Sequence, residues 1–385
     1  MHIAFLTTEY PCKASVKTGG IGTTIRNQAA LLLQSKVKVS VLLWTKHAFD
    51  DYEEDGVSIY CVTQANGGGV LSILRQQRDL GRKVSALCRE HSIDLVETND
   101  WEGNTAFAGI DVPVVLRFGG ANLLFGKLLN KKVPLALGIL ERLAVHRADA
   151  YVGVSEQSYN VSERIFHFNK SKPSTIIYNP VDLDRVASFC GKARPGKRIV
   201  FYGTLVEKKG VLLIPKVFNE VVRRHPDATL TMIGKDTNYM GGSMKAHIEA
   251  MFSSEARARV RIISHLAYDD LLRAVANHDI CLLPSYAETF GLVLLEGMAL
   301  KKAVVCSDIE PFMEIARDGI DCIHCHSGDS AAFTKAVLEV IEVPGRYLSL
   351  AEEASKRAFV KFAPRKLAQQ HIDFYNQVLE KCRKS

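Results

Sequence analysis

The sequence predicts two doubly wound α/β domains in tandem, each a parallel sheet covered by helices. Short β-rich runs alternate with longer helical patterns along the chain, which is typical of parallel strands joined by crossover helices. The length of 385 residues exceeds what one hydrophobic core usually organises and fits two domains of ordinary size. A polar stretch with Gly191, Pro195 and Gly196 interrupts the pattern near the middle of the chain and predicts the boundary there.

The first domain is expected over residues 1–182. Its strand candidates are HIAFLTT (2–8), VKVSVLLW (37–44), IDLVET (93–98), VPVVLRF (112–118), AYVGVS (150–155) and STIIYNP (174–180). Residues 21–34 are a predicted helix, because Ile21, Ile25 and Ala29 recur at helical spacing.

The second domain is expected over residues 199–364, after a linker at 183–198. Its strand candidates are RIVFYG (198–203), ATLTMIG (228–234), VRIISH (260–265), DICLLPS (279–285) and AVVCSD (303–308). Residues 365–385 form a last predicted helix with no strand after it, which we expect to cross back to the first domain. Sheets of this class bind ligands beyond the carboxyl ends of their strands, so a ligand cleft is expected there.

The composition excludes several classes of protein. Hydrophobic residues make up 47% and charged residues 24% of the chain, which is globular rather than disordered composition. No apolar run reaches the ~20 residues that cross a bilayer, and the opening MHIAFLTTEYP reads as a first strand rather than a signal peptide. Nine cysteines, an odd number, predict reduced thiols in a cytoplasmic protein rather than a disulfide framework.

The stretch DCIHCH places Cys322, His324, Cys325 and His326 close together in the sequence. A structural zinc site needs a second ligand pair at a defined spacing, and none follows. The sequence therefore favours an ordinary strand here and no metal.

Residues 117–147 concentrate positive charge. Six basic residues stand against the single acid Glu141, and they are Arg117, Lys127, Lys131, Lys132, Arg142 and Arg147. Two interpretations stay open: a solvated helix face, and peripheral docking onto an anionic membrane surface. Nucleic acid is not an expected partner, because no aromatic-interleaved basic patch or known binding module occurs.

The common nucleotide motifs are absent. No G-x-x-x-x-G-K-[ST] loop occurs, and the second strand lacks the ribose-binding acid that a nicotinamide fingerprint requires. The stretch VKTGGIGTT nevertheless places Gly19 and Gly20 before a helix, with Lys17 nearby. Bare amides at a helix N-terminus favour an anion, so we expect phosphate contact there. In the second domain, FYGTLVEKKGV has a similar arrangement, because a predicted strand ends at Gly203 and a lysine pair precedes the next helix. We expect Lys209 of this pair to bind the diphosphate.

Two glutamates bracket an apolar run in SYAETFGLVLLEGMA. We expect a helix to start near Phe290, and the rise of ~1.5 Å per residue would put Glu288 and Glu296 about 12 Å apart at most. A carboxylate accepts two hydroxyl donors at once, as a sugar diol offers. The amides of Phe290, Gly291 and Leu292 would point at the sugar or its phosphate. The pattern therefore predicts a sugar-nucleotide site.

This motif resembles that of the retaining glycosyltransferases of family 4, which have the GT-B fold, and the resemblance covers nearly the whole chain. Supporting segments are GGIGTTIRNQAALL, VGVSEQS, IIYNPVD, IGKDT and AVVCSDIEPFMEIARDG. The resemblance implies that Glu288 contacts the donor sugar, that Glu296 binds the ribose hydroxyls and that Lys209 neutralises the diphosphate. It also implies that Gly19 and Gly20 meet the phosphate.

The chain departs from the family pattern at three places. Gly203 is followed by Thr204 where Gly-Arg is common, so one phosphate-binding cation is missing. Gly119 stands where a histidine often follows the fourth strand, and TNDW replaces a frequent His-Asp-Trp. On this acceptor side, Asn99 and Asp100 are the candidates, Asp100 either orienting the acceptor hydroxyl or capping the following helix. Arg117 is the candidate for replacing the lost cation.

The resemblance implies a transferase that moves a hexose from a nucleotide diphosphate sugar, by family default a UDP-sugar, to a saccharide or lipid-linked saccharide with retention. The leaving diphosphate would accept the proton of the acceptor, without cofactor or metal. Cell-surface polysaccharide or lipopolysaccharide biosynthesis at the inner face of the membrane is the expected setting. The alternatives are a nucleotide-sugar epimerase or α-glucan synthase of the same fold, and a non-catalytic subunit that retains the nucleotide-sugar site.

Overall fold

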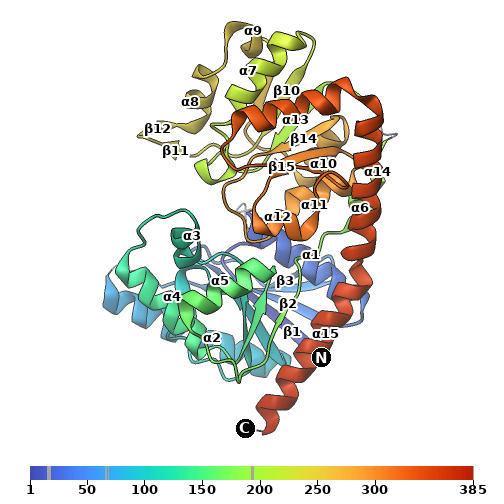
Figure 1. Ribbon diagram of the computed structural model, residues 1–385. Coiled ribbons are helices and arrows are strands. Elements are labelled where there is room, and N and C mark those ends of the chain that lie inside the picture. The colour runs from blue at the N-terminus through green and yellow to red at the C-terminus, as the bar shows by residue number, and fades with distance from the viewer. Residues whose placement is uncertain (15–18, 66, 68, 192–194, 385) are drawn as a thin grey trace. The chain divides into compact units, whose positions relative to one another are not determined.

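The computed structural model describes residues 1–14, 19–65, 67, 69–191 and 195–384. The chain forms two compact units, one comprising Met1–Pro180 with Pro364–Ser385 and the other Val181–Ala363. Each unit is a predominantly parallel sheet with helices packed against it (Figure 1). The predicted fold class, two doubly wound α/β domains, is confirmed. None of the described helices is long and apolar enough to cross a bilayer.

The sheet of the first unit has eight strands in the order β3-β4-β2-β1-β5-β6-β7-β8. They are β1 His2–Thr7, β2 Lys38–Thr45, β3 Tyr52–Glu54, β4 Val57–Thr63, β5 Leu95–Asn99, β6 Val114–Phe118, β7 Ala150–Gly153 and β8 Ser174–Ile176. Only the β3–β4 pairing is antiparallel. This hairpin was not predicted, although its turn, Asp55-Gly56, has positive φ at both residues as a two-residue hairpin turn requires.

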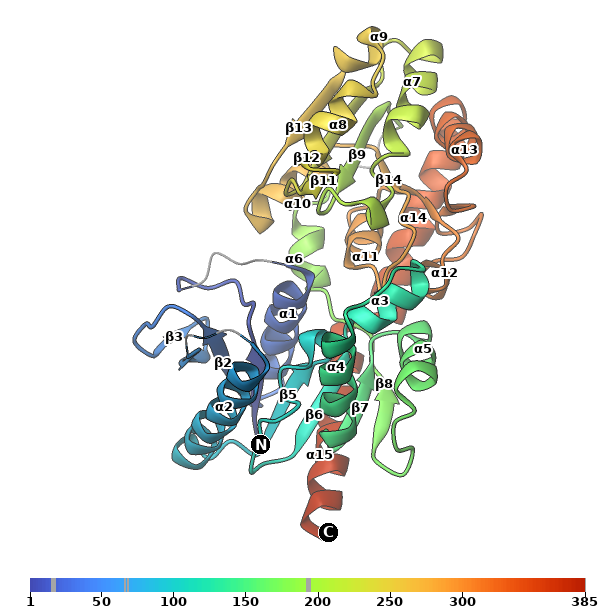
Figure 2. The same ribbon diagram turned by 90° about the vertical axis from the view of Figure 1, so that its left-hand side faces the viewer.

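Helices cover both faces of this sheet. They are α1 Gly20–Gln34, α2 Val70–His91, α3 Asn122–Leu128, α4 Leu135–Arg147, α5 Glu156–Phe166 and α15 Pro364–Lys384, with a 3-10 turn, η1, at Trp101–Gly103. Figure 2 shows α2 and α4 in front of the sheet and α15 behind it. Along β6, Leu116 and Phe118 pack in the cluster that includes α4, whereas Arg117 points to α15, as the period of two along a strand requires.

The C-terminal helix α15 belongs to the first unit because a buried polar network holds it there. Arg117 Nε donates to Glu97 Oε1 at 2.7 Å, and Tyr375 of α15 donates to Glu97 Oε2 at 2.7 Å. His371 Nε2 lies 2.9 Å from Arg117 Nη2. Burial and the neighbouring guanidinium lower the pKa of His371 to about 4, so the ring is neutral and Nε2 accepts that hydrogen bond.

The sheet of the second unit has six parallel strands in the order β13-β10-β9-β14-β15-β16. They are β9 Arg198–Tyr202, β10 Thr229–Ile233, β13 Val260–Ile263, β14 Ile280–Leu283, β15 Ala303–Ser307 and β16 Ile323–Cys325. A separate hairpin is formed by β11 Asn238–Tyr239 and β12 Gly242–Ser243.

The helices of the second unit follow the same alternation with the strands. They are α6 Leu183–Ser188, α7 Ile214–Arg224, α8 Met244–Ala250, α9 Ser254–Arg257, α10 Tyr268–Ala276, α11 Leu292–Ala299, α12 Glu310–Ile315, α13 Ser330–Glu342 and α14 Pro344–Lys361, with a 3-10 turn, η2, at Glu207–Lys209. The segment interpreted as a linker, 183–198, contains α6, so that interpretation is wrong for its first part. Asp182 caps this helix by accepting from the Arg185 amide at 3.0 Å.

Each sheet has a point where the strand order reverses. In the first unit β1 lies between β2 and β5, and in the second unit β9 lies between β10 and β14. Ligands of doubly wound sheets bind outside the carboxyl ends of the strands at such switch points. The loops after β1 and β5, and after β9 and β14, are therefore the places where functional residues are expected.

Candidate active site

The two loops at the switch point of the second unit bring Lys209 and Glu288 together. Lys209 Nζ lies 2.5 Å from Glu288 Oε1, and Ser285 Oγ donates to the same oxygen at 3.0 Å. Glu288 is only 7% exposed, so its charge is compensated by a cation and a hydroxyl rather than by bulk water. Sequence analysis proposed both residues for the site, separated by 79 positions, and the structure brings them into contact.

Close backbone packing fixes this pair. Gly210 has φ +68, and a Cβ there would lie 1.8 Å from the Pro284 carbonyl oxygen, so only glycine fits. The Tyr286 amide also donates to the Lys208 carbonyl at 2.8 Å. The loop that carries Lys209 is thus joined by its backbone to the loop that carries Glu288.

Gly203 directly follows β9 and has φ +139, a conformation that other residues rarely adopt. Its amide donates to the Ile233 carbonyl at 2.9 Å, and Thr204 after it is exposed. Both residues lie in the same loop as Lys209, where the resemblance places the donor phosphates.

Helix α11 begins at Leu292, with Gly291 as its N-cap at φ +121. A Cβ at Gly291 would lie 2.5 Å from the Phe312 ring, so this position accepts no side chain. Phe290 is buried against Phe362, with ring centroids 5.9 Å apart. The predicted helix is present, but it starts at Leu292 rather than at Phe290. Glu288 therefore lies four residues before the helix, and the helical spacing assumed between it and Glu296 does not apply. A loop, not a helical face, positions Glu288.

Glu296 is 4% exposed on α11 and forms no salt bridge with any residue that the structure describes. Tyr268 donates its phenol hydrogen to Glu296 Oε1 at 2.8 Å. Burial raises the pKa of Glu296 to about 7, although the Tyr268 hydrogen bond and the Lys209 charge oppose the shift. Tyr268 was not predicted. It lies 28 positions from Glu296 at the start of α10, and nothing in its own sequence context marks it.

In the first unit, Gly19 is the N-cap of α1, and Gly20 is its first residue. A Cβ at Gly19 would lie 2.4 Å from Glu9 Oε2, so a carboxylate stands beside the amides expected to bind phosphate. Gly20 has open space beside it. Lys17, the cation predicted for this site, lies outside the described residues.

The structure gives Asp100 a supporting position rather than a catalytic one. Its Oδ1 accepts from the Gly119 and Gly120 amides and its Oδ2 from the Ala121 amide, each at 3.0 Å. The side chain is fully buried. These bonds hold the turn before α3, and the Asp100 side chain does not cap the 3-10 turn that directly follows it. Asn99 Oδ1 accepts from the Trp101 amide at 3.2 Å and lies in the same loop.

Arg117 does not replace the missing phosphate-binding cation. It is 5% exposed, faces α15 and pairs with Glu97, so the proposed role is wrong for the arrangement observed. Its charge also cannot contribute to a basic surface over 117–147. Within this range Glu141 is buried too and accepts from the Asn122 and Leu123 amides at 2.7 and 2.9 Å.

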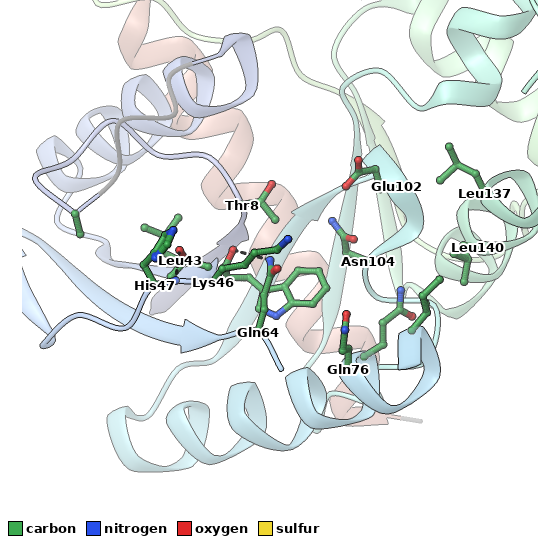
Figure 3. A pocket seen from close by; sticks show the side chains of 15 residues that line it. Thr8, Leu43, Lys46, His47, Gln64, Gln76, Glu102, Asn104, Leu137 and Leu140 are labelled. Atoms are coloured by element: carbon green, nitrogen blue, oxygen red, sulfur yellow. Dashed lines mark hydrogen bonds between the residues drawn. The ribbon is translucent and has the colours of Figure 1, made fainter. Parts of the chain in front are cut away.

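A cavity of about 670 Å³ opens at the carboxyl edge of the first sheet. Its polar lining includes Lys46, Gln64, Gln76, Glu102 and Asn104 (Figure 3), and Trp44 contributes an indole. Uncharged amides beside an aromatic ring are groups that bind sugar hydroxyls and sugar faces. Sequence analysis named none of these residues.

Among the described residues that line this cavity, Glu102 is the one acid. Its backbone is left-handed, with φ 59 and ψ 2, which is uncommon for a residue with a long side chain. A Cβ at the next residue, Gly103, would lie 2.3 Å from the Leu140 backbone, and Gln77 donates to the Gly103 carbonyl at 3.1 Å. Close packing against α4 therefore fixes the strained turn, and the turn exposes Glu102 to the cavity.

Comparisons with known proteins identify the family of the chain. Residues 18–185 match the Glycosyltransferase Family 4 model and residues 190–357 the model of Glycosyl transferases group 1. The chain is 22% identical to the uncharacterized glycosyltransferase MJ1607 of Methanocaldococcus jannaschii, over 99% of both chains.

Two solved structures show the same fold along the chain. Sucrose-phosphate synthase from Thermosynechococcus elongatus superposes with a TM-score of 0.81 at 17% identity, covering 99% of both chains. Anabaena Alr3699/HepE, solved in complex with UDP-glucose, superposes with a TM-score of 0.74 at 17% identity, covering 98% of this chain and 100% of that one. With one family model matched in each half, the chain belongs to the family 4-like glycosyltransferases of the GT-B fold.

Proposed function

We propose that this glycosyltransferase moves a hexose from a UDP-sugar to a saccharide or lipid-linked saccharide, with retention of the anomeric configuration. The observation that carries the proposal is the Lys209–Glu288 pair at the switch point of the second unit, followed along the chain by α11 with its buried Glu296. The likeness to HepE, which binds UDP-glucose, supports uridine as the base.

In this proposal the donor lies along the loops after β9 and β14. Gly203, Thr204 and Gly291 let the diphosphate approach the backbone, and Lys209 offsets its charge. Glu288 accepts hydrogen bonds from the sugar hydroxyls, and Glu296 accepts them from the ribose diol. In the first unit, the resemblance assigns phosphate binding to Gly19 and Gly20, with Lys17.

The transfer breaks the bond between the anomeric carbon and the phosphate oxygen and forms a bond to the acceptor oxygen on the same face. The acceptor proton passes to the leaving diphosphate. Lys209 and the amides of Phe290, Gly291 and Leu292 stabilise the charge that develops on this leaving group. We assign no metal to this step, because these groups can supply the stabilisation.

We place the acceptor saccharide in the cavity at the carboxyl edge of the first sheet. Trp44 would contact a sugar face, while Gln76 and Asn104 would bind hydroxyls and Glu102 would accept from one of them. Asn99 remains a candidate at the edge of this loop, whereas Asp100 supports the turn.

A membrane surface is the second partner that the structure favours. Among residues 118–147 the only acid, Glu141, is buried, and the exposed basic residues are Lys127, Lys131, Lys132, Arg142 and Arg147. Leu135 and Ile139 of α4 are 81% and 47% exposed. Exposed apolar side chains among cations suit an anionic lipid surface. This arrangement fits assembly of a cell-surface polysaccharide or lipopolysaccharide from the cytoplasmic side.

The test is turnover of UDP-sugars by the full chain, with and without saccharide acceptors. We expect acceptor-dependent release of UDP, reduced at least about 100-fold in Glu288→Ala and Lys209→Ala. Lys216→Ala, at an exposed lysine of α7, is the matched control. If both site variants stayed within a few-fold of wild type, the donor assignment would be wrong.

The same assay separates the alternatives. Conversion of the sugar nucleotide without an acceptor identifies an epimerase, and elongation of an α-glucan alone identifies a glucan synthase. Binding of UDP-sugars without turnover on any acceptor identifies a non-catalytic subunit.

A further inference from the structure

A group of sulfur and nitrogen atoms lies where β15 pairs with β16, and it includes the residue that directly precedes β16. Cys306 Sγ, Cys322 Sγ and a ring nitrogen of His324 all lie within 4.8 Å of one another. Cys306 is directly opposite His324 in the parallel pairing, and its Sγ lies 3.5 Å from His324 Nδ1. The transfer reaction proposed above uses none of these side chains.

We propose that Cys306, Cys322 and His324 bind one divalent ion of the zinc class. Tetrahedral zinc, with Zn–S of about 2.3 Å and Zn–N of about 2.0–2.1 Å, holds its donor atoms roughly 3.5–3.8 Å apart. The 3.5 Å separation of Cys306 Sγ and His324 Nδ1 already fits, and small movements of the remaining atoms complete the set. Thiolate and imidazole ligands select zinc-like ions and exclude magnesium and calcium, which require oxygen.

The surroundings of His324 fit a ligand. Its Nε2 lies 3.2 Å from the Ala316 carbonyl oxygen, so a hydrogen placed on Nε2 leaves Nδ1 with a lone pair toward Cys306. Metal-binding histidines commonly donate their other N–H to a carbonyl in this way. Nδ1 also lies 3.0 Å from the Ser307 carbonyl, a contact that the metal-bound tautomer gives up.

The turn that presents Cys322 is held independently of any metal. Arg317 pairs with Asp321 through two hydrogen bonds of 2.8 Å, and Arg357 Nε lies 3.3 Å from the same carboxylate. The His324 amide donates to Asp318 Oδ1 at 2.8 Å. The ligands are therefore positioned before binding, which lowers the ordering cost.

Charge balance favours the same ligand set. Cys306 and Cys322 are each fully buried, and two thiolates with one neutral imidazole exactly offset the charge of a divalent ion. His324 is half-buried. Three protein ligands leave a fourth position for water or a small anion.

The ion would cross-link Cys306 to Cys322, so the segment between them, which contains α12, would become a closed loop. Phe312 of α12 is the residue that leaves no room for a Cβ at Gly291, at the head of α11. The site would thereby stiffen the support of the donor helix without touching the donor.

The test is titration of the full, reduced and metal-free chain with Co²⁺. We expect one Co²⁺ per chain, with thiolate-to-cobalt absorption in the near ultraviolet and intense tetrahedral bands in the visible, displaced by Zn²⁺. Cys306→Ala and Cys322→Ala should each lose the bands. Cys325→Ala, at a buried cysteine of the same strand that is not in the group, should keep them.

Circular dichroism of each variant and a thiol titration of wild type accompany the measurement. Absence of the bands in fully reduced, folded wild type overturns the proposal, and so does their persistence in both variants. If an alanine variant does not fold, His324→Gln replaces it, and retention of the thiolate bands at wild-type affinity there also overturns the proposal.

Discussion

The affinity for the donor should rise with pH around neutrality because of Glu296. Burial raises the pKa of this carboxyl to about 7, so roughly half of the free protein carries it protonated at neutral pH. The proposed ribose diol donates two hydrogen bonds, which requires the ionised form. A group that must lose a proton on binding weakens affinity about tenfold for each pH unit below its pKa. We therefore expect the Kd for the UDP-sugar to fall about tenfold between pH 6 and pH 8.

Calorimetric titration with UDP-glucose at pH 6, 7 and 8 measures this effect. The diphosphate of a sugar nucleotide stays fully ionised over this range, so the ligand adds no titration of its own. Buffers of different ionisation enthalpy report the proton released. Glu296→Gln is the isosteric control and should bind weakly and independently of pH. A Kd that falls with increasing pH equally in Glu296→Gln would refute the assignment, as would a Kd that does not change in wild type.

Three further predictions concern structure and acceptor binding. Arg117→Ala leaves Glu97 as an uncompensated buried charge and should lower the free energy of unfolding by about 3–5 kcal/mol in urea denaturation. Glu102→Gln should raise the KM for the acceptor about 10- to 100-fold and leave the melting temperature unchanged. Asp100→Asn should instead lower the free energy of unfolding by about 1–3 kcal/mol and leave the KM for the acceptor within a few-fold of wild type. The reverse pattern would assign Asp100 to the acceptor site. Gly291→Ala places a Cβ at a residue with positive φ and against the buried Phe312 ring, so it should lower the free energy of unfolding by at least about 1–3 kcal/mol. A variant as stable as wild type would contradict the packing described.

The fold and the positions of the loops that carry Lys209 and Glu288 could be predicted because their signals are local. The alternation of β-rich and helical segments predicted the fold class, and glycines before helices predicted the turns between strands and helices. The Lys209 and Glu288 loops each follow a strand, and strands next to a switch point bring such loops together. The register of the helix could not be predicted to the residue, because Phe290 continues the apolar pattern although the positive φ at Gly291 delays the start to Leu292.

Partners distant in sequence explain the predictions that were wrong. Arg117 reads as a free cation in a basic segment, yet its partner Glu97 lies 20 positions earlier and its neighbour His371 lies 254 positions later. Asp100 has the residue type of an acceptor-binding acid, but three backbone amides surround it. Glu102, two residues on, is exposed to the cavity by a strained turn that no composition or periodicity reports.

The two glutamates of the motif differ in a way that suits two tasks. Glu288 has an ammonium at 2.5 Å and a hydroxyl at 3.0 Å, so it has polar partners before any ligand arrives. Glu296 accepts a hydrogen bond from the Tyr268 phenol, but burial still raises the pKa of its carboxyl. Its ionised form is therefore unfavourable until hydroxyl donors are supplied. In the proposed mechanism, a diphosphate arriving at Lys209 competes with Glu288 for the same ammonium, which would free carboxylate oxygen for the sugar hydroxyls. Binding of the phosphate and binding of the sugar would then be coupled through one lysine, so we expect both residues to be needed although they differ in charge.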